Sequence, residues 1–327
     1  MNFEKKTILV TGGCGSFGQK FTETVLKEHD PSSIRIYDNR ELAGVEMERR
    51  LDDPRLRFFI GDIRDQKRLC RAMDGVDIVV HAAALKHVPI CEYNPIEAVK
   101  TNIDGAVSVI DAAINNNVEK VIAISTDKAV YPVNLYGATK MVAEKLFIQA
   151  NSYSGGKKTV FSCSRYGNVV GSSGSIIPLF FKQKNNGEIT ITDGKMTRFW
   201  ITLEEGIKFV FKSIEIMKGG EIFIPKISSM KVIDLAEVIA PDTKKKIIGI
   251  RPGEKLHEIL LTEEEALHSK EFDNFFVIEP EYSFWRKDNL KNGKSLPTGF
   301  KYASNNNNKW MTKEELVKIL DEIKTEE

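Results

Sequence analysis

Short apolar runs alternate with longer amphipathic stretches through the first half of the chain. Runs rich in β-branched residues favour buried strands, and helical periodicity marks the stretches between them. The strands expected are KTILVT (6–11), SIRIYD (33–38), LRFFIGD (56–62), DIVVHAA (77–83), KVIAIST (120–126) and KTVFSCSRYGNVV (158–170). The helices expected are 17–29, 66–73, 96–115 and 134–151. This alternation predicts an α/β fold of the Rossmann type, a doubly wound parallel sheet with helices on both faces.

The pattern changes after Gly171, where turns, short strands and short helices mix. Residues 205–225 return to a helix followed by a strand, which predicts that they rejoin the sheet. We therefore expect a large domain of residues 1–170 plus about 205–225. Residues 171–204 and 226–327 form a smaller mixed α/β lobe, which would leave a cleft against the sheet. Within that lobe, SMKVIDLAEVIA (229–240) and TKEELVKIL (312–320) read as helices.

Composition narrows the functional classes. The chain has 327 residues, a formal net charge of +1, 42% hydrophobic and 28% charged residues. This balance favours neither nucleic acid nor a membrane surface as a partner. The apolar run near the N-terminus is too short to span a membrane. The four cysteines are far apart and form no CxxC or metal-ligand pattern, which favours a reduced, cytoplasmic protein without a bound metal.

A glycine-rich turn follows the first strand, in ILVTGGCGSFGQKF. Gly12, Gly15 and Gly18 are spaced G-x-x-G-x-x-G between a strand and a helix, with Ser16 and Phe17 inside the pattern. Glycines at this place let the backbone approach a pyrophosphate at a helix N-terminus. The turn therefore predicts a dinucleotide site.

Asp38 ends the second strand, 20 residues beyond Gly18. A carboxylate there can accept hydrogen bonds from an adenosine ribose and repel a 2′-phosphate, which favours NAD. Arg40 could instead pair with a 2′-phosphate, so NADP stays the alternative. Asp62 could accept from an adenine amino group or cap the next helix. The other cofactor contacts that we expect are Ile63, Ala82 and Ala83, whereas His81 fits a packed strand residue better than a catalyst.

Reactive side chains gather in STDKAVYPVNLYGATK (125–140), where the fifth strand ends. The carboxyl end of a parallel strand faces the cofactor crevice in this fold. Tyr136 and Lys140 are four residues apart, on one helical face. The ammonium group and a nicotinamide cation both favour tyrosinate, so Tyr136 can accept a hydroxyl proton while hydride leaves the same carbon. Thr126 would hydrogen-bond the same hydroxyl group.

Asp127 and Lys128 form a second pair that simple alcohol oxidation does not need. Oxidation of an alcohol to a ketone acidifies the adjacent C–H bond, so that a base can remove its proton while an acid helps to expel a β-hydroxyl as water. Lys128 suits the base and Asp127 the acid. These roles require a partly shielded Asp127 and a Lys128 whose pKa is partly depressed. The alternative is a solvated ion pair in a loop.

Several motifs together resemble the extended short-chain dehydrogenase/reductases, and among them the UDP-N-acetylglucosamine 4,6-dehydratases of the type that opens pseudaminic acid pathways. The resemblance extends over nearly the whole chain. It lies in TGGCGSFG, GDIRD, HAAALKHVPICEYNPIEAVKTN, STDKAV, NLYGATK, SRYGNVVGSSGS, TDGKMTRFWIT, RPGEKLHEIL and NNKWMTKEEL. It implies oxidation at C4, loss of water across C5–C6 and hydride return to C6, in many members with inversion at C5.

The resemblance also implies contacts to a UDP-sugar, largely from the smaller, nucleotide-sugar-binding lobe. Lys86 in ALKHVP matches a residue near the sugar, and Asn168 in RYGNV matches a diphosphate contact. Arg198, Arg251 and Glu254 match a nucleotide-diphosphate clamp, and two arginines suit a diphosphate by charge. Surface ion pairing is the alternative for each arginine. The family further implies a homo-oligomer.

Three residues depart from the family pattern. Cys14 replaces a threonine of the glycine turn, and Ser173 stands where many relatives have arginine. Asp38 replaces the serine usual in NADP-using relatives, which suggests that this chain uses NAD. The use of NAD in turn raises a second possible reaction in the same pathway. In that reaction the chain would act on the UDP-6-deoxy-GlcNAc-5,6-ene and form the 4-keto-6-deoxy-L-AltNAc sugar. Two further functions stay open, that of a 4-epimerase and that of a non-catalytic nucleotide-binding protein.

Overall fold

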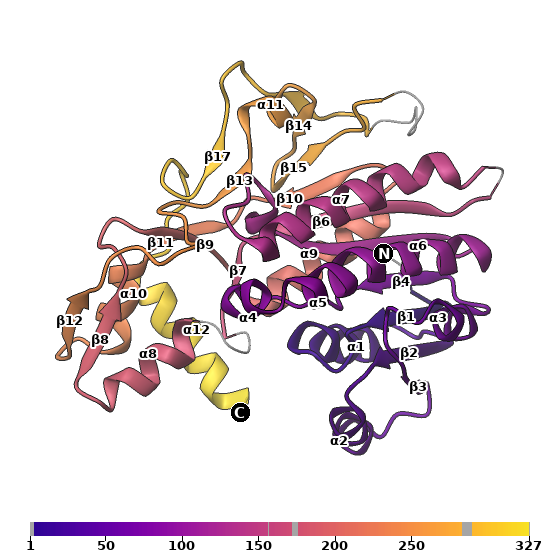
Figure 1. The fold of residues 1–327 in the computed structure, drawn as a ribbon, viewed down its shortest axis with the longest axis horizontal. Helices are drawn as coiled ribbons and strands as arrows, with labels where there is room; N and C mark the ends of the chain where they lie inside the picture. Colours follow the sequence, from indigo (N-terminus) through magenta and orange to yellow (C-terminus); the bar gives the residue numbers. More distant parts are fainter. Residues whose placement is uncertain (1–2, 156, 172–175, 283–289, 327) are drawn as a thin grey trace.

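A ten-stranded sheet forms the centre of the protein in the computed structural model, which describes residues 3–155, 157–171, 176–282 and 290–326 (Figure 1). Its parallel strands, in spatial order, are β3 (Leu56–Ile60), β2 (Ser33–Asp38), β1 (Thr7–Thr11), β4 (Ile78–His81), β5 (Lys120–Thr126), β6 (Val160–Tyr166) and β10 (Ile222–Pro225). The first five predicted strands are confirmed with small shifts at their ends. The sixth, 158–170, is divided into β6 in this sheet and β7 (Asn168–Val169) in a smaller one. Strands β4 and β6 are buried along their whole length, as expected for a sheet covered on both faces.

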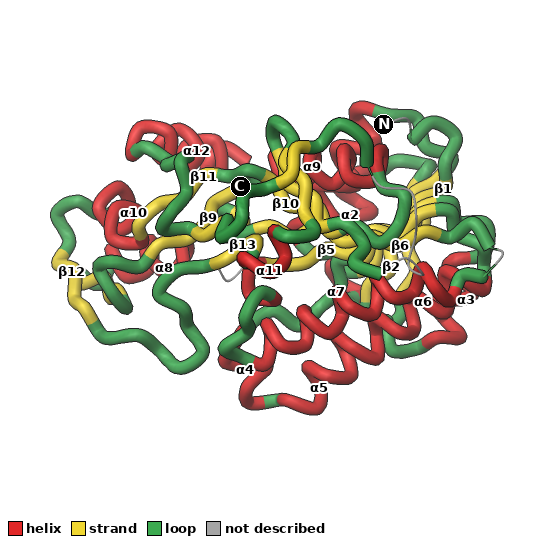
Figure 2. The backbone as a smooth tube through the Cα atoms, turned by 90° about the horizontal axis from the view of Figure 1, so that it is seen from above, coloured by secondary structure: helices red, strands yellow, loops and turns green. Residues whose placement is uncertain are grey.

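Helices cover the two faces of this sheet (Figure 2). On one face α6 (Gly105–Asn115) packs between α3 (Gln66–Met73) and α7 (Leu135–Tyr153) and contacts both. On the other face α1 (Ser16–Glu28) packs on α9 (Leu203–Ile216). The helix and strand predicted for 205–225 are thus confirmed as α9 and β10.

The single helix predicted for 96–115 is wrong in detail. It consists of α5 (Pro95–Val99), a π-helical segment η1 (Lys100–Asp104) and α6, and it is preceded by α4 (Val88–Tyr93). Single π-helical turns that interrupt an α-helix frequently lie at functional sites. Here the turn carries Asn102, whose side chain is buried and hydrogen-bonds the backbone of Leu85.

The remaining strands belong to the second half of the chain. Strands β15 (Phe275–Ile278), β14 (Ser269–Glu271) and β16 (Lys294–Ser295) continue the main sheet beyond β10 in antiparallel order. The smaller sheets are β11–β9–β7 (Ser228–Lys231, Thr197–Ile201 and Asn168–Val169), β12–β8 (Lys244–Ile247 and Glu188–Ile191) and β13–β17 (Ile259–Leu261 and Tyr302–Ala303).

A second apolar core lies away from the main sheet. Side chains of α8 (Ile176–Lys184), α10 (Val232–Ile239) and α12 (Lys313–Glu326) meet there around the buried Trp200. The helix predicted from 312–320 is confirmed as α12, and the helix predicted from 229–240 is confirmed as α10 from Val232 on, whereas 229–231 belong to a strand, β11. Within the described part of the chain, no helix is both long and apolar enough to cross a membrane.

Candidate active site

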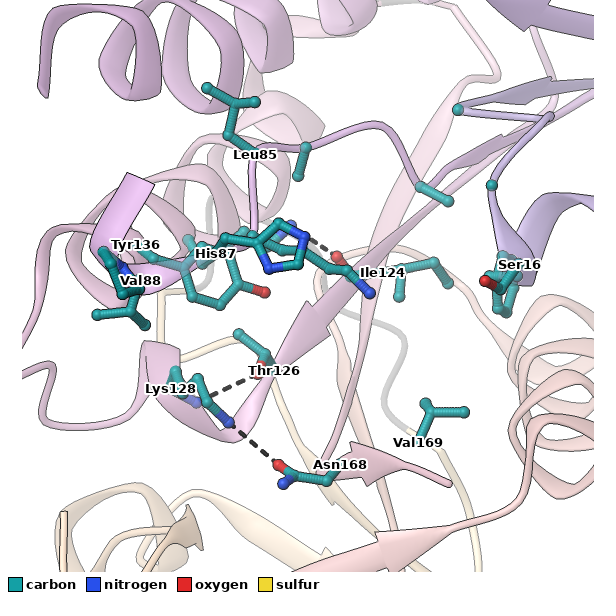
Figure 3. A pocket seen from close by; sticks show the side chains of 18 of the residues that line it. Ser16, Leu85, His87, Val88, Ile124, Thr126, Lys128, Tyr136, Asn168 and Val169 are labelled. Carbon is teal, nitrogen blue, oxygen red and sulfur yellow. Dashed lines mark hydrogen bonds between the residues drawn. The ribbon is translucent and has the colours of Figure 1, made fainter. Parts of the chain in front are cut away.

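A cavity of about 2070 Å³ opens at the carboxyl ends of the parallel strands, between the sheet and the second apolar core (Figure 3). A site for one drug-sized ligand has roughly 300–1,000 Å³. The cavity therefore has room for a dinucleotide and a second ligand of similar size.

Most of the predicted site residues line this cavity. They are Gly12, Gly15, Ser16, Phe17, Asp38, Arg40, Asp62, Ile63, Ala82, Ala83, Lys86, Thr126, Lys128, Tyr136, Lys140, Asn168, Arg198, Arg251 and Glu254. Gly18 and Asp127 are buried and do not line the cavity. Ser173 lies outside the described residues.

The glycine turn leaves open a cradle that a side chain would fill. Gly12 has φ +66°, and a Cβ atom on it would lie 2.8 Å from the backbone of Ala83. Gly15 is the N-cap of α1 and offers no side chain in front of the helix N-terminus. Backbone amides and a positive helix end facing a cavity suit a pyrophosphate. The turn therefore fits a dinucleotide cofactor.

Asp38 is held from two sides at the end of β2. Its Oδ2 accepts from the backbone N–H of Cys14 at 3.0 Å, so the carboxylate is fixed to the glycine turn. Arg40 donates to both oxygens through Nε and Nη2, each at 3.0 Å. The guanidinium group is therefore engaged by Asp38, which makes it less available to a 2′-phosphate.

Asp62 is engaged in a similar way by Arg64. Nη2 of Arg64 lies 2.6 Å from one Asp62 oxygen, and Nη1 reaches Glu97. The pKa of Asp62 is lowered, chiefly by hydrogen bonds from Arg64. The alternative that Asp62 caps the next helix is wrong, because Asp65 accepts the capping hydrogen bond from Arg68 N. The donor of this capping hydrogen bond lies three positions after its N-cap residue, which makes Asp65 and not Asp62 the cap of α3.

The end of β5 presents the reactive residues of 126–140 to the cavity. Lys128 lies in the 3₁₀ turn Asp127–Ala129, and its amine donates to Asp127 Oδ1 at 2.9 Å. The same amine donates to Asn168 Oδ1 at 3.1 Å (Figure 3). Thr126 Oγ1 donates to the same Asp127 oxygen at 3.0 Å. Asp127 is fully buried, so it reaches the cavity only through Thr126 and Lys128.

Tyr136 is brought close to this turn by a glycine. A Cβ atom on Gly137 would lie 2.1 Å from the carbonyl oxygen of Lys128, so the helix and the turn can approach only if residue 137 has no side chain. The N-cap Asn134 accepts from Gly137 N and donates to Gly253 O, which ties α7 to the RPGEK loop. Tyr136 and Thr126 thus face the same space (Figure 3).

The expected depressed pKa of Lys128 is wrong. Burial alone would lower the pKa of its amine, but the carboxylates of Asp127 and Glu258 outweigh burial and raise it. The carboxylate of Glu258 lies 3.8 Å from the amine. The pKa of Asp127 is raised, because burial and the charge of Glu258 outweigh Lys128. Asp127 therefore suits a proton-holding acid, as expected, whereas Lys128 rests as an ammonium.

Burial raises the pKa of Tyr136 to about 12, against the opposing effects of Lys128 and Thr126. Lys140 donates to the carbonyl oxygen of Ile124 at 2.7 Å, and burial lowers the pKa of its amine. His81 is buried, contacts Thr11 Oγ1 at 2.8 Å and has its pKa lowered to about 3 by burial and by Lys140. The prediction that His81 is a packed strand residue is confirmed.

The two arginines predicted for the diphosphate clamp also line the cavity. Arg198 is largely buried and donates to the carbonyl oxygens of Thr197 and Leu256. Arg251 is exposed at the cavity, in a turn closed by a hydrogen bond from Glu254 N to its carbonyl oxygen. The two arginines therefore share one cavity, with one buried and one open to solvent.

Two residues of the site were not predicted from the sequence. Asn102 exchanges hydrogen bonds with the backbone of Leu85 at 2.8 and 2.9 Å and donates to Thr139 at 2.9 Å, so it holds the loop before Lys86 against α7. Glu258 is buried beside Lys128. These residues occur in the motifs AVKTN and KLHE, but nothing in either motif indicates that the polar side chain is buried.

Comparison with known proteins agrees with this geometry. Residues 8–280 match a family described as polysaccharide biosynthesis protein. The UDP-N-acetylglucosamine 4,6-dehydratase (inverting) of Campylobacter jejuni serotype O:2 is 52% identical, over 98% of each chain. A UDP-glucose 4-epimerase of Rickettsia akari is 42% identical, over 84% of this chain and 83% of its own. The X-ray structure of Pen from Bacillus thuringiensis superposes with a TM-score of 0.91 and 39% identity, covering 99% of both chains.

Proposed function

The chain belongs to the polysaccharide biosynthesis protein family and is an extended short-chain dehydrogenase/reductase of the UDP-N-acetylglucosamine 4,6-dehydratase type, and from this membership we propose its reaction. The substrate is UDP-N-acetylglucosamine. The enzyme oxidises C4, eliminates water across C5–C6, returns the hydride taken from C4 to C6 and protonates C5 with inversion, which gives a 6-deoxy-4-keto sugar.

One observation carries this proposal beyond simple oxidation. The hydrogen-bonded pair Asp127–Lys128 lies in the same site as Tyr136 and the glycine turn. A 4-epimerase needs Tyr136 for proton transfer at C4 but has no step that uses Lys128. A second acid–base unit is what removal of the C5 proton and loss of the C6 hydroxyl require.

We propose that Tyr136 accepts the proton of the C4 hydroxyl, while Thr126 hydrogen-bonds that hydroxyl. The turn of Gly12 and Gly15 and the carboxylate of Asp38 would hold a nicotinamide dinucleotide, NAD rather than NADP. When bound, this group supplies the hydride acceptor and donor, and a positive charge that favours tyrosinate. Lys140 adds its own charge from the next turn of α7.

The dehydration step depends on a proton exchange within the second pair. Lys128 passes one proton to Asp127, which leaves a neutral amine and a neutral carboxyl group. The amine then takes the C5 proton, and the proton on Asp127 travels through the Thr126 hydroxyl to the departing C6 hydroxyl, which leaves as water. The raised pKa of Asp127 favours the first of these transfers, whereas the raised pKa of Lys128 opposes it, so the neutral pair is the less populated form.

Residues 171–204 and 226–327 bind the nucleotide sugar, with Arg198, Arg251 and Asn168 at the diphosphate and Lys86 near the sugar. The enzyme works as a homo-oligomer and supplies a pseudaminic acid pathway.

Incubation with UDP-N-acetylglucosamine in deuterated water tests the reaction, read by NMR. A 6-deoxy-4-keto product with deuterium at C5 and inverted C5 is expected. A product that differs from the substrate only in C4 configuration would instead show a 4-epimerase. Turnover only with the 5,6-ene would show the second-step enzyme.

A further inference from the structure

Three cationic side chains from separate parts of the chain lie close to the carboxylate of Glu258. Glu258 lies just before β13, is buried, and lines the cavity. Its Oε1 is 3.8 Å from Lys128 Nζ and 3.8 Å from Arg198 Nε, and its Oε2 is 3.5 Å from Lys255 Nζ. A buried carboxylate needs such compensation, because an unpaired charge in a protein interior is strongly destabilising.

We propose that Glu258 is a positioning residue for dehydration, which holds Lys128 in place against Asp127 and Asn168 and sets the charge state in which Lys128 meets the sugar. The inference rests on the proposed function, since it assigns Glu258 to the step that the Asp127–Lys128 pair performs.

The geometry around Lys128 supports this role. An ammonium group has three donors, and two of them are used by Asp127 and Asn168. Glu258 lies on a further side of the same amine, so Lys128 is held between two carboxylates, one from the 3₁₀ turn after β5 and one from the segment before β13. Without Glu258, the nearest charge on that side would be the guanidinium of Arg198, which repels an ammonium.

The charged and titratable groups facing this cluster define the pH experiment. Lys128 faces Asp127, Glu258 and Arg198, with Tyr136 beside it. Glu258 faces Lys255 as well. His257 is the neighbouring residue, bonded to Thr197 and faced by Arg198 and Asp193.

The test is the pH dependence of kcat in Glu258→Gln, measured with UDP-N-acetylglucosamine. Loss of the negative charge lowers the pKa of both Lys128 and Asp127. The plot of kcat against pH should have a rising limb, set by the loss of a proton from Lys128, and a falling limb, set by the loss of the proton that Asp127 must keep. Both limbs should move to lower pH by about one unit or more. Misplacement of Lys128 should lower kcat by about 10- to 100-fold, with KM within about threefold. Glu258→Asp should bring both limbs back toward their wild-type positions.

Two controls separate positioning from stability. Glu221 is buried to the same degree and bonded to Ser162, away from the cavity, so Glu221→Gln should change stability but leave the limbs in place. The effect of Glu258→Gln on kcat should also vanish in the Lys128→Ala background, because the two residues act as a unit. A limb of the pH profile that disappears in His257→Asn would be due to titration of the His257 imidazole.

The inference would be overturned if Glu258→Gln left both limbs of the pH profile in place. It would also be overturned if Glu258→Gln lowered kcat as much in the Lys128→Ala background as in the wild type. If Glu258→Gln does not fold, Lys255→Met replaces it. That change removes a competing cation and should move both limbs to higher pH, and an unmoved profile would again overturn the inference. A wild-type enzyme that does not dehydrate UDP-N-acetylglucosamine would instead overturn the proposed function.

Discussion

The amine of Lys128 donates to Oδ1 of Asp127 at 2.9 Å, and the carboxyl group is buried while the amine lines the cavity. Neighbouring side chains in a regular strand point to opposite faces of the sheet. The 3₁₀ turn at the end of β5 brings them to the same side, so an acid and an amine can act on one ligand. The site therefore holds two proton-transfer units, this pair and Tyr136, which substitutions can separate.

Lys128→Ala should separate oxidation from dehydration. The C4 hydroxyl gives its proton to Tyr136, so the variant should still oxidise C4 in a single turnover, seen by stopped-flow absorbance of reduced nicotinamide. Removal of the C5 proton loses its base, and product formation should fall by about 10²- to 10⁴-fold. Lys128→Arg is the matched control, because it keeps the charge but cannot release a proton. Normal product formation by either variant would contradict the assignment.

Tyr136→Phe should stop the reaction one step earlier. The variant keeps the buried ring but has no hydroxyl to accept the C4 proton, so no absorbance of reduced nicotinamide should appear. Because the pKa of Tyr136 is raised to about 12 by burial, the tyrosinate fraction and the first-step rate should increase with pH in the wild type. Thr126→Val should slow the same step less, since it removes only a hydrogen bond. Rapid cofactor reduction by Tyr136→Phe would exclude Tyr136 as the proton acceptor.

Cofactor choice should depend on the contact between Asp38 and Arg40. Mass spectrometry of nucleotide released from denatured wild-type protein should show NAD(H). In Asp38→Ser, the guanidinium of Arg40 loses both carboxylate contacts and becomes available to a 2′-phosphate, so affinity for NADP should rise relative to NAD. Adding Arg40→Ala should reverse this gain. Mainly NADP(H) in the wild type would show that Arg40 decides the choice despite Asp38.

Much of the fold and of the cofactor end could be predicted from the sequence, because the signals there are local. Strands and their glycine turn follow one another directly, and parallel strands place their carboxyl ends at one edge of the sheet. Asp38 and Thr126 could thus be assigned to one cavity from the positions at which their strands end.

The charge state of the site could not be predicted in this way. The pKa of Lys128 depends on Glu258, which is 130 residues away in the chain and reaches the site through tertiary packing. Asn102 lies in a π-turn that the apolar periodicity of 96–115 does not reveal. In both cases a polar residue occurs in an otherwise ordinary helix or strand pattern, and its partner comes from another part of the chain.

An ion-pair triad, in which Arg165 and Glu144 are buried and Glu265 is partly exposed, holds the segment that carries Glu258. Arg165 on β6 donates to Glu144 on α7 at 2.7 Å and to Glu265 on α11 (Glu263–Ala266) at 2.9 Å. It also donates to the carbonyl oxygen of Leu260 in β13 at 3.1 Å. The triad thereby joins the helix of Tyr136 to the strand that follows Glu258.

The contribution of Glu265 in this triad to the free energy of unfolding should depend on pH. Burial would raise the pKa of Glu265, but Arg165 outweighs burial and lowers it. The stability that Glu265 adds is therefore fully present above the pKa of an unfolded glutamate, about 4.3, and is lost as pH falls through the lower folded value. Near neutral pH, Glu265→Gln should reduce the free energy of unfolding by about 1.5–3 kcal/mol, measured by urea denaturation, and the difference should shrink in acid. Glu263→Gln, on the same helix but exposed, should change it by less than about 0.5 kcal/mol. An equal loss for Glu265→Gln at neutral and acidic pH would mean that its charge does not stabilise the fold.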